Sequence, residues 1–141
     1  MSEQQKFNEA DCAYLAAVID LRARVRIQRE QRRNQTYRTL FLQLVDVPKP
    51  VADWIMERFG PARCVSRSEG VEITYVTLRA AEICVHAYPH LVAMKRVATL
   101  VTKFGSSIGP SRSPVSPEAR AIREQVDREL QSIASGRGGR R

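Results

Sequence analysis

Two neighbouring stretches in which apolar and polar residues alternate constrain the fold of this chain more than any other feature of its sequence. A period of two is typical of a strand with one buried face. The first stretch begins at Arg22, the second covers 37–45, and the polar segment 29–35 between them has the character of a turn. The alternation therefore predicts a β-hairpin. Its inward-facing residues are Ala23, Val25, Ile27, Leu40, Leu42 and Leu44.

The opposite face of this hairpin is polar. Its first strand presents arginines and a glutamine, and its second strand presents aromatic, hydroxyl and amide groups. Arginine and glutamine donate hydrogen bonds to phosphates and to base edges, so the face is a candidate surface for nucleic acid. The outward-facing residues are Arg22, Arg24, Arg26, Gln28, Tyr37, Thr39, Phe41 and Gln43.

The positive charge of the chain is concentrated in the same hairpin. The 141 residues include 23 Lys and Arg against 15 Asp and Glu, a formal net charge of +8. Seven arginines and one acid, Glu30, lie between positions 22 and 38, so this segment alone contributes +6. A basic patch favours a polyanionic partner, and Arg32 and Arg33 in the turn belong to it. The alternative is a solvated basic hairpin with no ligand.

Helical spacing and turn residues outline the rest of the chain as an α+β protein. The Ser-, Gly- and Pro-rich segment 105–117 is typical of a linker. It separates a main domain, 1–104, from a last helix, 118–134, and a disordered basic tail, 135–141. The predicted order is α-β-β-α-β-β-α-α-linker-α. In the main domain we expect helices over 9–21, 48–60, 78–88 and 91–104, and a second hairpin over 63–66 and 71–76.

Several functional classes are disfavoured. No stretch approaches the roughly 20 consecutive apolar residues of a membrane span, and the first residues are polar rather than signal-like. Cys12, Cys64 and Cys84 are far apart and support neither a disulfide framework nor a zinc site. His86 and His90 have metal-pair spacing, but the proline between them disrupts a helix. We expect a protein of the cytoplasm or nucleoid that is not secreted, whether a phage, an organelle or a cell encodes it.

The segment 14–23 resembles the signature helix of the LAGLIDADG homing endonucleases. The predicted α-β-β-α-β-β-α order is similar to the core of that family. Phe59-Gly60 resembles the end of its second helix, and 88–91 followed by 94–96 resembles its Pro-Tyr-Leu…Lys-Arg segment. Together these likenesses span about residues 7 to 104, and the linker and last helix are compatible with family members.

The resemblance implies two such domains that pack through their signature helices and place a saddle of antiparallel strands in the DNA major groove. This chain has one signature, so it would pair as a homodimer. The helix contacts would come from Leu15, Ala16, Ala17, Val18 and Leu21. The residues expected to contact nucleic acid are Arg22, Arg24, Arg26, Gln28, Arg32, Arg33, Tyr37, Thr39, Gln43, Lys95 and Arg96.

The chain departs from the family where catalysis needs an acid. Family members place an acid at the eighth position of each of the two signature helices. Together these two acids bind divalent metal and activate water. That position is Arg22, and a guanidinium cannot ligate Mg²⁺. Asp20, two residues earlier, is rotated by about 200° along a helix and should point away. Lys95 matches the basic residue that supports catalysis in the family. We therefore expect a binding protein without metal or cofactor.

Three alternatives stay open. A divergent homing endonuclease would cleave DNA with Mg²⁺ through rearranged acids such as Asp20, or by pairing with an intact partner chain. The basic face would also suit RNA, as in intron maturases. In a structural or assembly role, the sheet would instead bind acidic groups of a protein.

Overall fold

The chain folds as predicted into helices and a sheet in the order α-β-β-α-β-β-α-α-α. A computed structural model describes residues 8–108 and 115–139, and of 135–139 only the backbone. The elements are α1 (Glu9–Arg22), β1 (Ala23–Arg32), β2 (Gln35–Val47), α2 (Lys49–Phe59), β3 (Arg63–Arg67), β4 (Gly70–Val76), α3 (Thr77–Ala87), a 3-10 turn (Tyr88–His90), α4 (Lys95–Ser106) and α5 (Pro117–Gly139).

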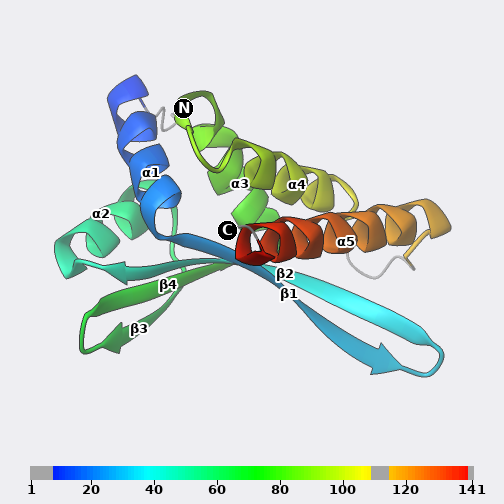
Figure 1. The fold of residues 1–141 in the computed structure, drawn as a ribbon. Helices are drawn as coiled ribbons and strands as arrows, with labels where there is room; N and C mark the ends of the chain where they lie inside the picture. The colour runs from blue at the N-terminus through cyan, green and yellow to red at the C-terminus, as the bar shows by residue number, and fades with distance from the viewer. Residues whose placement is uncertain (1–7, 109–114, 140–141) are drawn as a thin grey trace, which may run out of the picture.

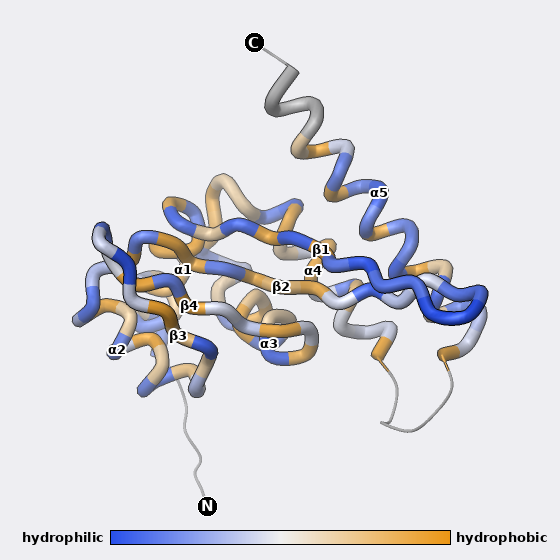
Figure 2. Tube along the Cα trace, turned by 90° about the horizontal axis from the view of Figure 1, so that it is seen from below, coloured by the Kyte–Doolittle hydropathy of each residue, from blue (hydrophilic) through white to orange (hydrophobic). Residues whose placement is uncertain are grey.

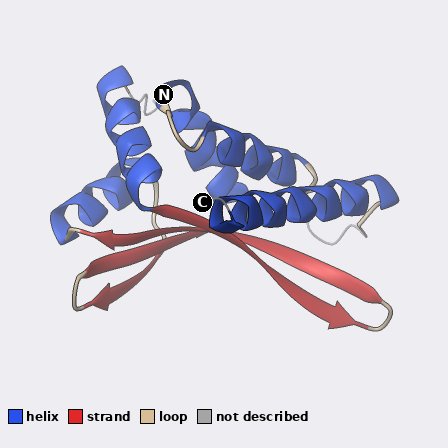
Figure 3. Cartoon of the chain, viewed as in Figure 1, coloured by secondary structure: helices blue, strands red, loops and turns tan. Residues whose placement is uncertain are grey.

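The strands form one antiparallel sheet in the order β1-β2-β4-β3. The described helices lie on one side of this sheet, and none of them covers its other side, which we call the open side or open face (Figures 1 and 3). β4 pairs with β2 only from Phe41 onward, so the first part of β2 and its partner β1 continue past the rest of the sheet as a two-stranded arm. The sheet curves, and its open side is concave in the view of Figure 1. The predicted α+β class and the sheet saddle are confirmed.

The first hairpin is longer than the alternation predicted. β1 pairs with β2 without interruption from Ala23 opposite Leu44 to Arg32 opposite Gln35. The turn is therefore reduced to Arg33 and Asn34, and Arg33 takes the left-handed conformation with φ of 52°. Residues 29–32 are polar on both faces, which hides the period of two although the hydrogen-bonded ladder continues through them.

The core lies between the helices and the inner face of the sheet. Leu40, Leu42 and Leu44 are at most 1% exposed, as the alternation predicted, and they pack with Leu15 and Ile19 of α1. Ala23, Val25 and Ile27 are only half-buried, because β1 is the edge strand. Burying aliphatic side chains of this size stabilises a fold by about 1.5–3 kcal/mol each.

Three further predicted boundaries differ from the structure. The fourth helix begins at Lys95 rather than at 91, because the 3-10 turn and a bend take up the residues before it. The predicted linker begins inside α4, and its residues 109–114 lie outside the described part of the chain. α5 continues to Gly139, so the predicted disordered tail is helical as far as that residue, and 140–141 lie outside the described residues.

None of the helices in the described ranges is long and apolar enough to cross a membrane.

Candidate nucleic-acid interface

The open side of the sheet presents the two predicted rows of polar side chains. The register places Arg24 opposite Gln43 and Gln28 opposite Thr39, so the arginine row of β1 lies directly beside the second row on β2. Figure 2 views the molecule from this side, where no helix crosses the sheet and the far end of the hairpin is strongly hydrophilic. The predicted residues that share this open face are Arg24, Arg26, Gln28, Arg32, Tyr37, Thr39, Phe41 and Gln43.

Aromatic rings on β2 orient two of these arginines. The guanidinium carbon of Arg26 lies 4.9 Å from the centroid of the Phe41 ring, and that of Arg32 lies 5.4 Å from the Tyr37 ring. A cation over a ring at an exposed site is stabilised by about 0.5–1 kcal/mol. Neither Arg24 nor Arg26 forms an ion pair within the described residues, so their charge is available to a ligand.

Two further arginines of the open face were missed in the sequence. Arg63 and Arg67 lie on β3, where Arg63 is opposite Thr74, which in turn is opposite Gln43 of β2. The available signal was their spacing of four residues, which places both on one face once the predicted strand 63–66 is continued by one residue to Arg67. Glu72 moderates the charge here. It accepts a hydrogen bond from Arg67 at 3.0 Å and from Gln43 at 3.1 Å.

Two arginines of the basic segment 22–38 serve the fold instead. Arg29 and Arg38 point to the helical side of the sheet and donate from Nε to the buried carboxylate of Asp127 on α5, at 2.7 and 2.8 Å. Burial alone would raise the pKa of Asp127, but the hydrogen bonds and charges of the two arginines outweigh it and hold that pKa below its ordinary value. The charge of the open face is therefore smaller than the sequence total suggested.

Lys95 and Arg96, which the sequence predicts as nucleic-acid contacts, lie away from the sheet rows. Both lie in the first turn of α4, in the helical layer. The ammonium of Lys95 lies 5.5 Å from the centroid of the Tyr88 ring, and Arg96 pairs with Glu129 of α5 at 3.3 Å. Their position fits a contact between helices better than a contact with a ligand on the open face.

Arg22 ends α1 beside an open groove. This groove has a volume of about 510 Å³. The exposed side chains of Arg22 and Arg24 line it together with Met94 and apolar residues of α1, β1, β2, α4 and α5. Across the described residues, no three His, Cys, Asp or Glu side chains come together in a way that would hold a metal ion.

The carboxylate of Asp20 is occupied by hydrogen bonds within the fold. It accepts hydrogen bonds from the backbone N–H groups of Val92, Ala93 and Met94 at 2.8, 3.0 and 2.9 Å. These are the residues that lead into α4. The carboxylate therefore ties the end of α1 to the segment before α4, a contact over more than 70 positions in the sequence.

Replacing Asp20 by alanine is expected to lower the free energy of unfolding by about 2 kcal/mol, because three backbone donors lose their acceptor. Asp20→Asn keeps one acceptor oxygen and should lose less. Urea denaturation of both variants measures the difference. Equal stability of wild type and Asp20→Ala would show that these hydrogen bonds contribute nothing and would return Asp20 to the list of catalytic candidates.

The predicted pairing residues of α1 divide between two faces, which corrects that prediction. Leu15 and Ala16 are fully buried in the core of their own domain and cannot contact a second chain. Ala17 is exposed and Leu21 is 78% exposed. They continue a stripe of small exposed residues that includes Ala10 and Ala13, with Val18 half-buried at its border. This stripe on the outer face of α1 is apolar, and the described residues leave it exposed.

Comparisons with known proteins agree with this architecture. No protein-family model and no curated protein matches the chain. Among solved structures, the homing endonuclease I-CvuI in complex with its target aligns with a TM-score of 0.61 at 16% identity, over 92% of this chain and 95% of that one.

Two further solved structures agree as well. The archaeal intron-encoded homing endonuclease I-Vdi141I, complexed with DNA, gives a TM-score of 0.69 at 10% identity, over 88% of this chain and 84% of that one. The LAGLIDADG homing endonuclease I-GzeII, in complex with a DNA target, gives 0.64 at 15% identity, over 85% of this chain and 43% of that one. The chain therefore has the LAGLIDADG homing endonuclease fold.

Proposed function

We propose that this chain binds double-stranded DNA through the open face of its sheet, acts as a homodimer, and does not cleave the DNA. The observation that carries the proposal is the row of arginines on the concave face, where Arg24 and Arg26 have no carboxylate partner in the described structure. Glu30 of the same row pairs with Arg32, whereas the neighbouring charges of Arg24 and Arg26 repel each other unless an anion neutralises them, which favours a polyanionic ligand.

The shape and chemistry of this face suit a duplex. The major groove admits a two-stranded β-ribbon, and the β1–β2 arm is such a ribbon with its polar row facing outward. Arginine pairs with guanine, and glutamine pairs with adenine, by two hydrogen bonds each, so Arg24, Arg26 and Gln28 can read bases as well as contact phosphates. The similar solved structures are complexes with DNA, and this supports DNA over another polyanion.

The absence of cleavage follows from two side chains at the end of α1. Arg22 occupies the place where the resembled enzymes need a metal-binding acid, and a guanidinium has no lone pair to offer a cation. Asp20 holds three backbone donors, so metal binding would have to break them. Arg22 instead supplies a positive charge where the resembled enzymes hold a metal, next to the DNA backbone. An active nuclease would nick a plasmid with Mg²⁺ or Mn²⁺, and such nicking, lost in Asp20→Asn, would refute this part of the proposal.

A selection from a randomised duplex pool tests the binding proposal. The enriched duplex is then competed against a scrambled duplex, a structured RNA and heparin at about 50 and 200 mM salt, a range over which purely electrostatic binding falls steeply. We expect an enriched sequence with two-fold symmetry, and a preference over the scrambled duplex that survives the higher salt. Equal displacement by all competitors would indicate a generic polyanion response, and preference for the RNA would replace DNA as the partner.

Pairing of two chains through α1 is the second part of the proposal. The exposed stripe that contains Ala17 and Leu21 is the surface of the signature helix that the domain leaves uncovered. Alanines allow two helix backbones to approach closely, whereas Leu21 adds bulk at one end of the stripe. A two-fold pair of α1 helices would also place two sheet faces side by side and lengthen the DNA contact.

Ala17→Leu is expected to weaken dimerisation at least tenfold, because inserting methylenes into a close contact costs about 1–3 kcal/mol. Sedimentation equilibrium of the free protein measures the dissociation constant. Ala121→Leu, at an exposed position of α5, is the matched control and should leave it unchanged. A wild-type chain that sediments as a monomer even when saturated with the selected duplex would refute the homodimer.

A further inference from the structure

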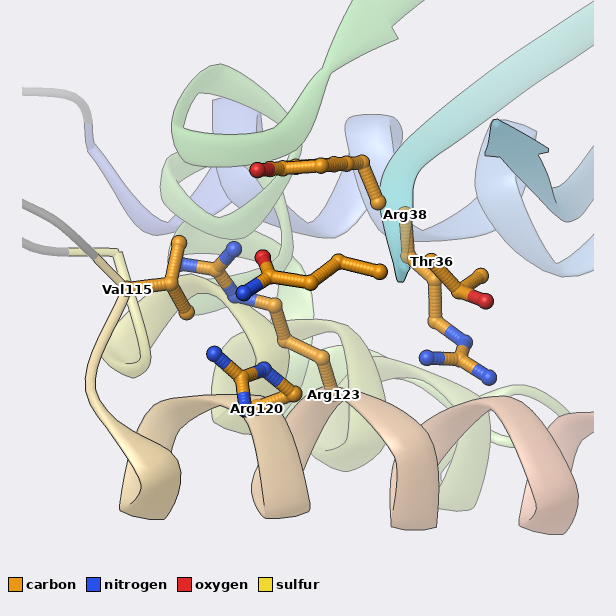
Figure 4. A pocket seen from close by; sticks show the side chains of 7 residues that line it. Thr36, Arg38, Val115, Arg120 and Arg123 are labelled. Carbon is orange, nitrogen blue, oxygen red and sulfur yellow. The ribbon is translucent and has the colours of Figure 1, made fainter. Parts of the chain in front are cut away.

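A narrow pocket lies where the first turns of α5 pass the free edge of the β1–β2 arm (Figure 4). Residues 35–40 of β2 precede its pairing with β4, so in the described structure no strand covers this edge. Tyr37 lines the pocket and also belongs to the open face. The pocket therefore opens at the border of the proposed DNA-binding surface. It is lined by Gln35, Thr36, Tyr37, Arg38, Val115, Arg120 and Arg123.

Three arginines line this pocket, and among the described residues only Arg38 has a carboxylate partner. Arg38 shares the carboxylate of Asp127 with Arg29. Within the described residues, neither Arg120 nor Arg123 forms an ion pair. The pocket therefore has an excess of positive charge.

Arg123 is held by neutral groups only. It donates from its guanidinium to the hydroxyl and the carbonyl oxygen of Ser107, both at 2.9 Å. Burial lowers the pKa of Arg123, because no anion compensates the loss of water around its charge. An anion in the pocket would supply this missing compensation.

The position of Arg120 in the first turn of α5 destabilises the helix when no anion is bound. The helix begins at Pro117, and the hydroxyl of Ser116 caps it by accepting from the N–H of Ala119 at 3.0 Å. Arg120 follows directly, in the first turn, where the helix dipole favours anions and disfavours cations by about 0.3–1 kcal/mol. A cation there, half-buried and unpaired, is better explained by a ligand than by stability.

The size of the pocket limits the ligand. The space open to the centre of a water-sized group measures about 10 Å³, within a hollow of about 270 Å³ that includes the open mouth. This space admits about one water-sized oxygen. A phosphodiester fits this shape, because one non-bridging oxygen enters while the rest of the group stays in the mouth, and guanidinium groups bind phosphate oxygens by charge-assisted hydrogen bonds.

We propose that this pocket binds a backbone phosphate of the nucleic acid through Arg120 and Arg123. The source of the phosphate rests on the proposed function, in which a duplex lies on the adjoining open face. The contact would extend the DNA-binding surface from the sheet to α5 and would fix the duplex at the free edge of the arm.

The salt dependence of duplex binding tests the assignment. Arg120→Ala should weaken binding about three- to tenfold, and should reduce the slope of log K against log salt by about one per chain, since each phosphate contact contributes about 0.9. Arg120→Lys should keep most of the slope. Arg128→Ala removes an exposed arginine of the same helix that does not line the pocket, and should leave the slope unchanged. An Arg120→Ala slope equal to that of wild type would overturn the proposal.

A second measurement separates this proposal from the proposed function. Inorganic phosphate is titrated into ¹⁵N-labelled protein while the side-chain Nε–H resonances of Arg120 and Arg123 are followed. We expect both to shift in wild type and the Arg123 shift to be reduced in Arg120→Ala. If wild type bound no duplex but showed these shifts, the anion site would stand and the DNA proposal would fail. If duplex bound and phosphate shifted neither resonance, the pocket proposal alone would fail.

Discussion

Replacing Asp127 by alanine is expected to lower the free energy of unfolding by about 3 kcal/mol, the largest effect on stability that we predict for a single polar residue. Asp127 is 4% exposed, and its carboxylate accepts from both Arg29 and Arg38. Removing one partner of a buried ion pair costs about 3–5 kcal/mol, because the remaining charge stays buried. The lower end applies here, since the Arg29 side chain is 43% exposed and can turn to water.

The pH dependence of stability provides a separate measure of the same contact. The pKa of Asp127 is lower in the folded chain than in the unfolded one, so its contribution is fully present above its unfolded pKa, near 4. The contribution is lost as the pH falls through the folded pKa. Urea denaturation between about pH 2.5 and 7 should therefore show a smaller acid-induced loss in Asp127→Asn than in wild type. An equal loss in both would place the acid sensitivity elsewhere.

This contact also bears on the arm. α5 holds the inner face of the β1–β2 arm, where β4 no longer supports it. Asp127→Glu, which keeps the charge, should recover part of the stability lost in Asp127→Ala. If Asp127 contributed by packing alone, the longer glutamate would recover none of that stability. The arginine row of the open face depends on this contact of α5 with the inner face, because the inner and outer side chains belong to the same two strands.

The alternation of polar and apolar residues explains why the open face was predictable. A period of two fixes the face of every residue once one buried position is known, so the rows on β1 and β2 followed from the sequence alone. The same period of two also places Arg29 and Arg38 on the inner face. Their partner lies 98 and 89 positions away, and no local pattern connects it to them.

The signature helix shows the opposite case. The run Tyr14 to Ile19 is apolar on every side, so its sequence does not distinguish the face that meets the core from the face left uncovered. The packing of α1 against the sheet decides the buried face: Leu15 and Ile19 are buried, and Ala17 is exposed. The hydrogen bonds of Asp20 were equally hidden, since its three donors are backbone groups that any sequence provides.

Reversing the charge of Arg24 and Arg26 together should reduce affinity for the selected duplex at least a hundredfold. Both side chains lie on the open face without an acid partner in the described structure. Each good contact between an arginine and a base is worth about 1–3 kcal/mol. Each glutamate would moreover repel the phosphates, and a dimer carries every change twice.

The control for Arg24→Glu/Arg26→Glu must separate the position of the charge from its amount. Arg79→Glu/Arg128→Glu changes the net charge equally but on exposed residues of α3 and α5. Fluorescence anisotropy at about 0.1 M salt compares the two, and their melting temperatures show whether each is folded. Because steering by the whole protein field depends on total charge, a similar loss in both variants would mean that the duplex responds to net charge alone and that the open face does not bind it. A hundredfold loss confined to the sheet variant requires contact at β1.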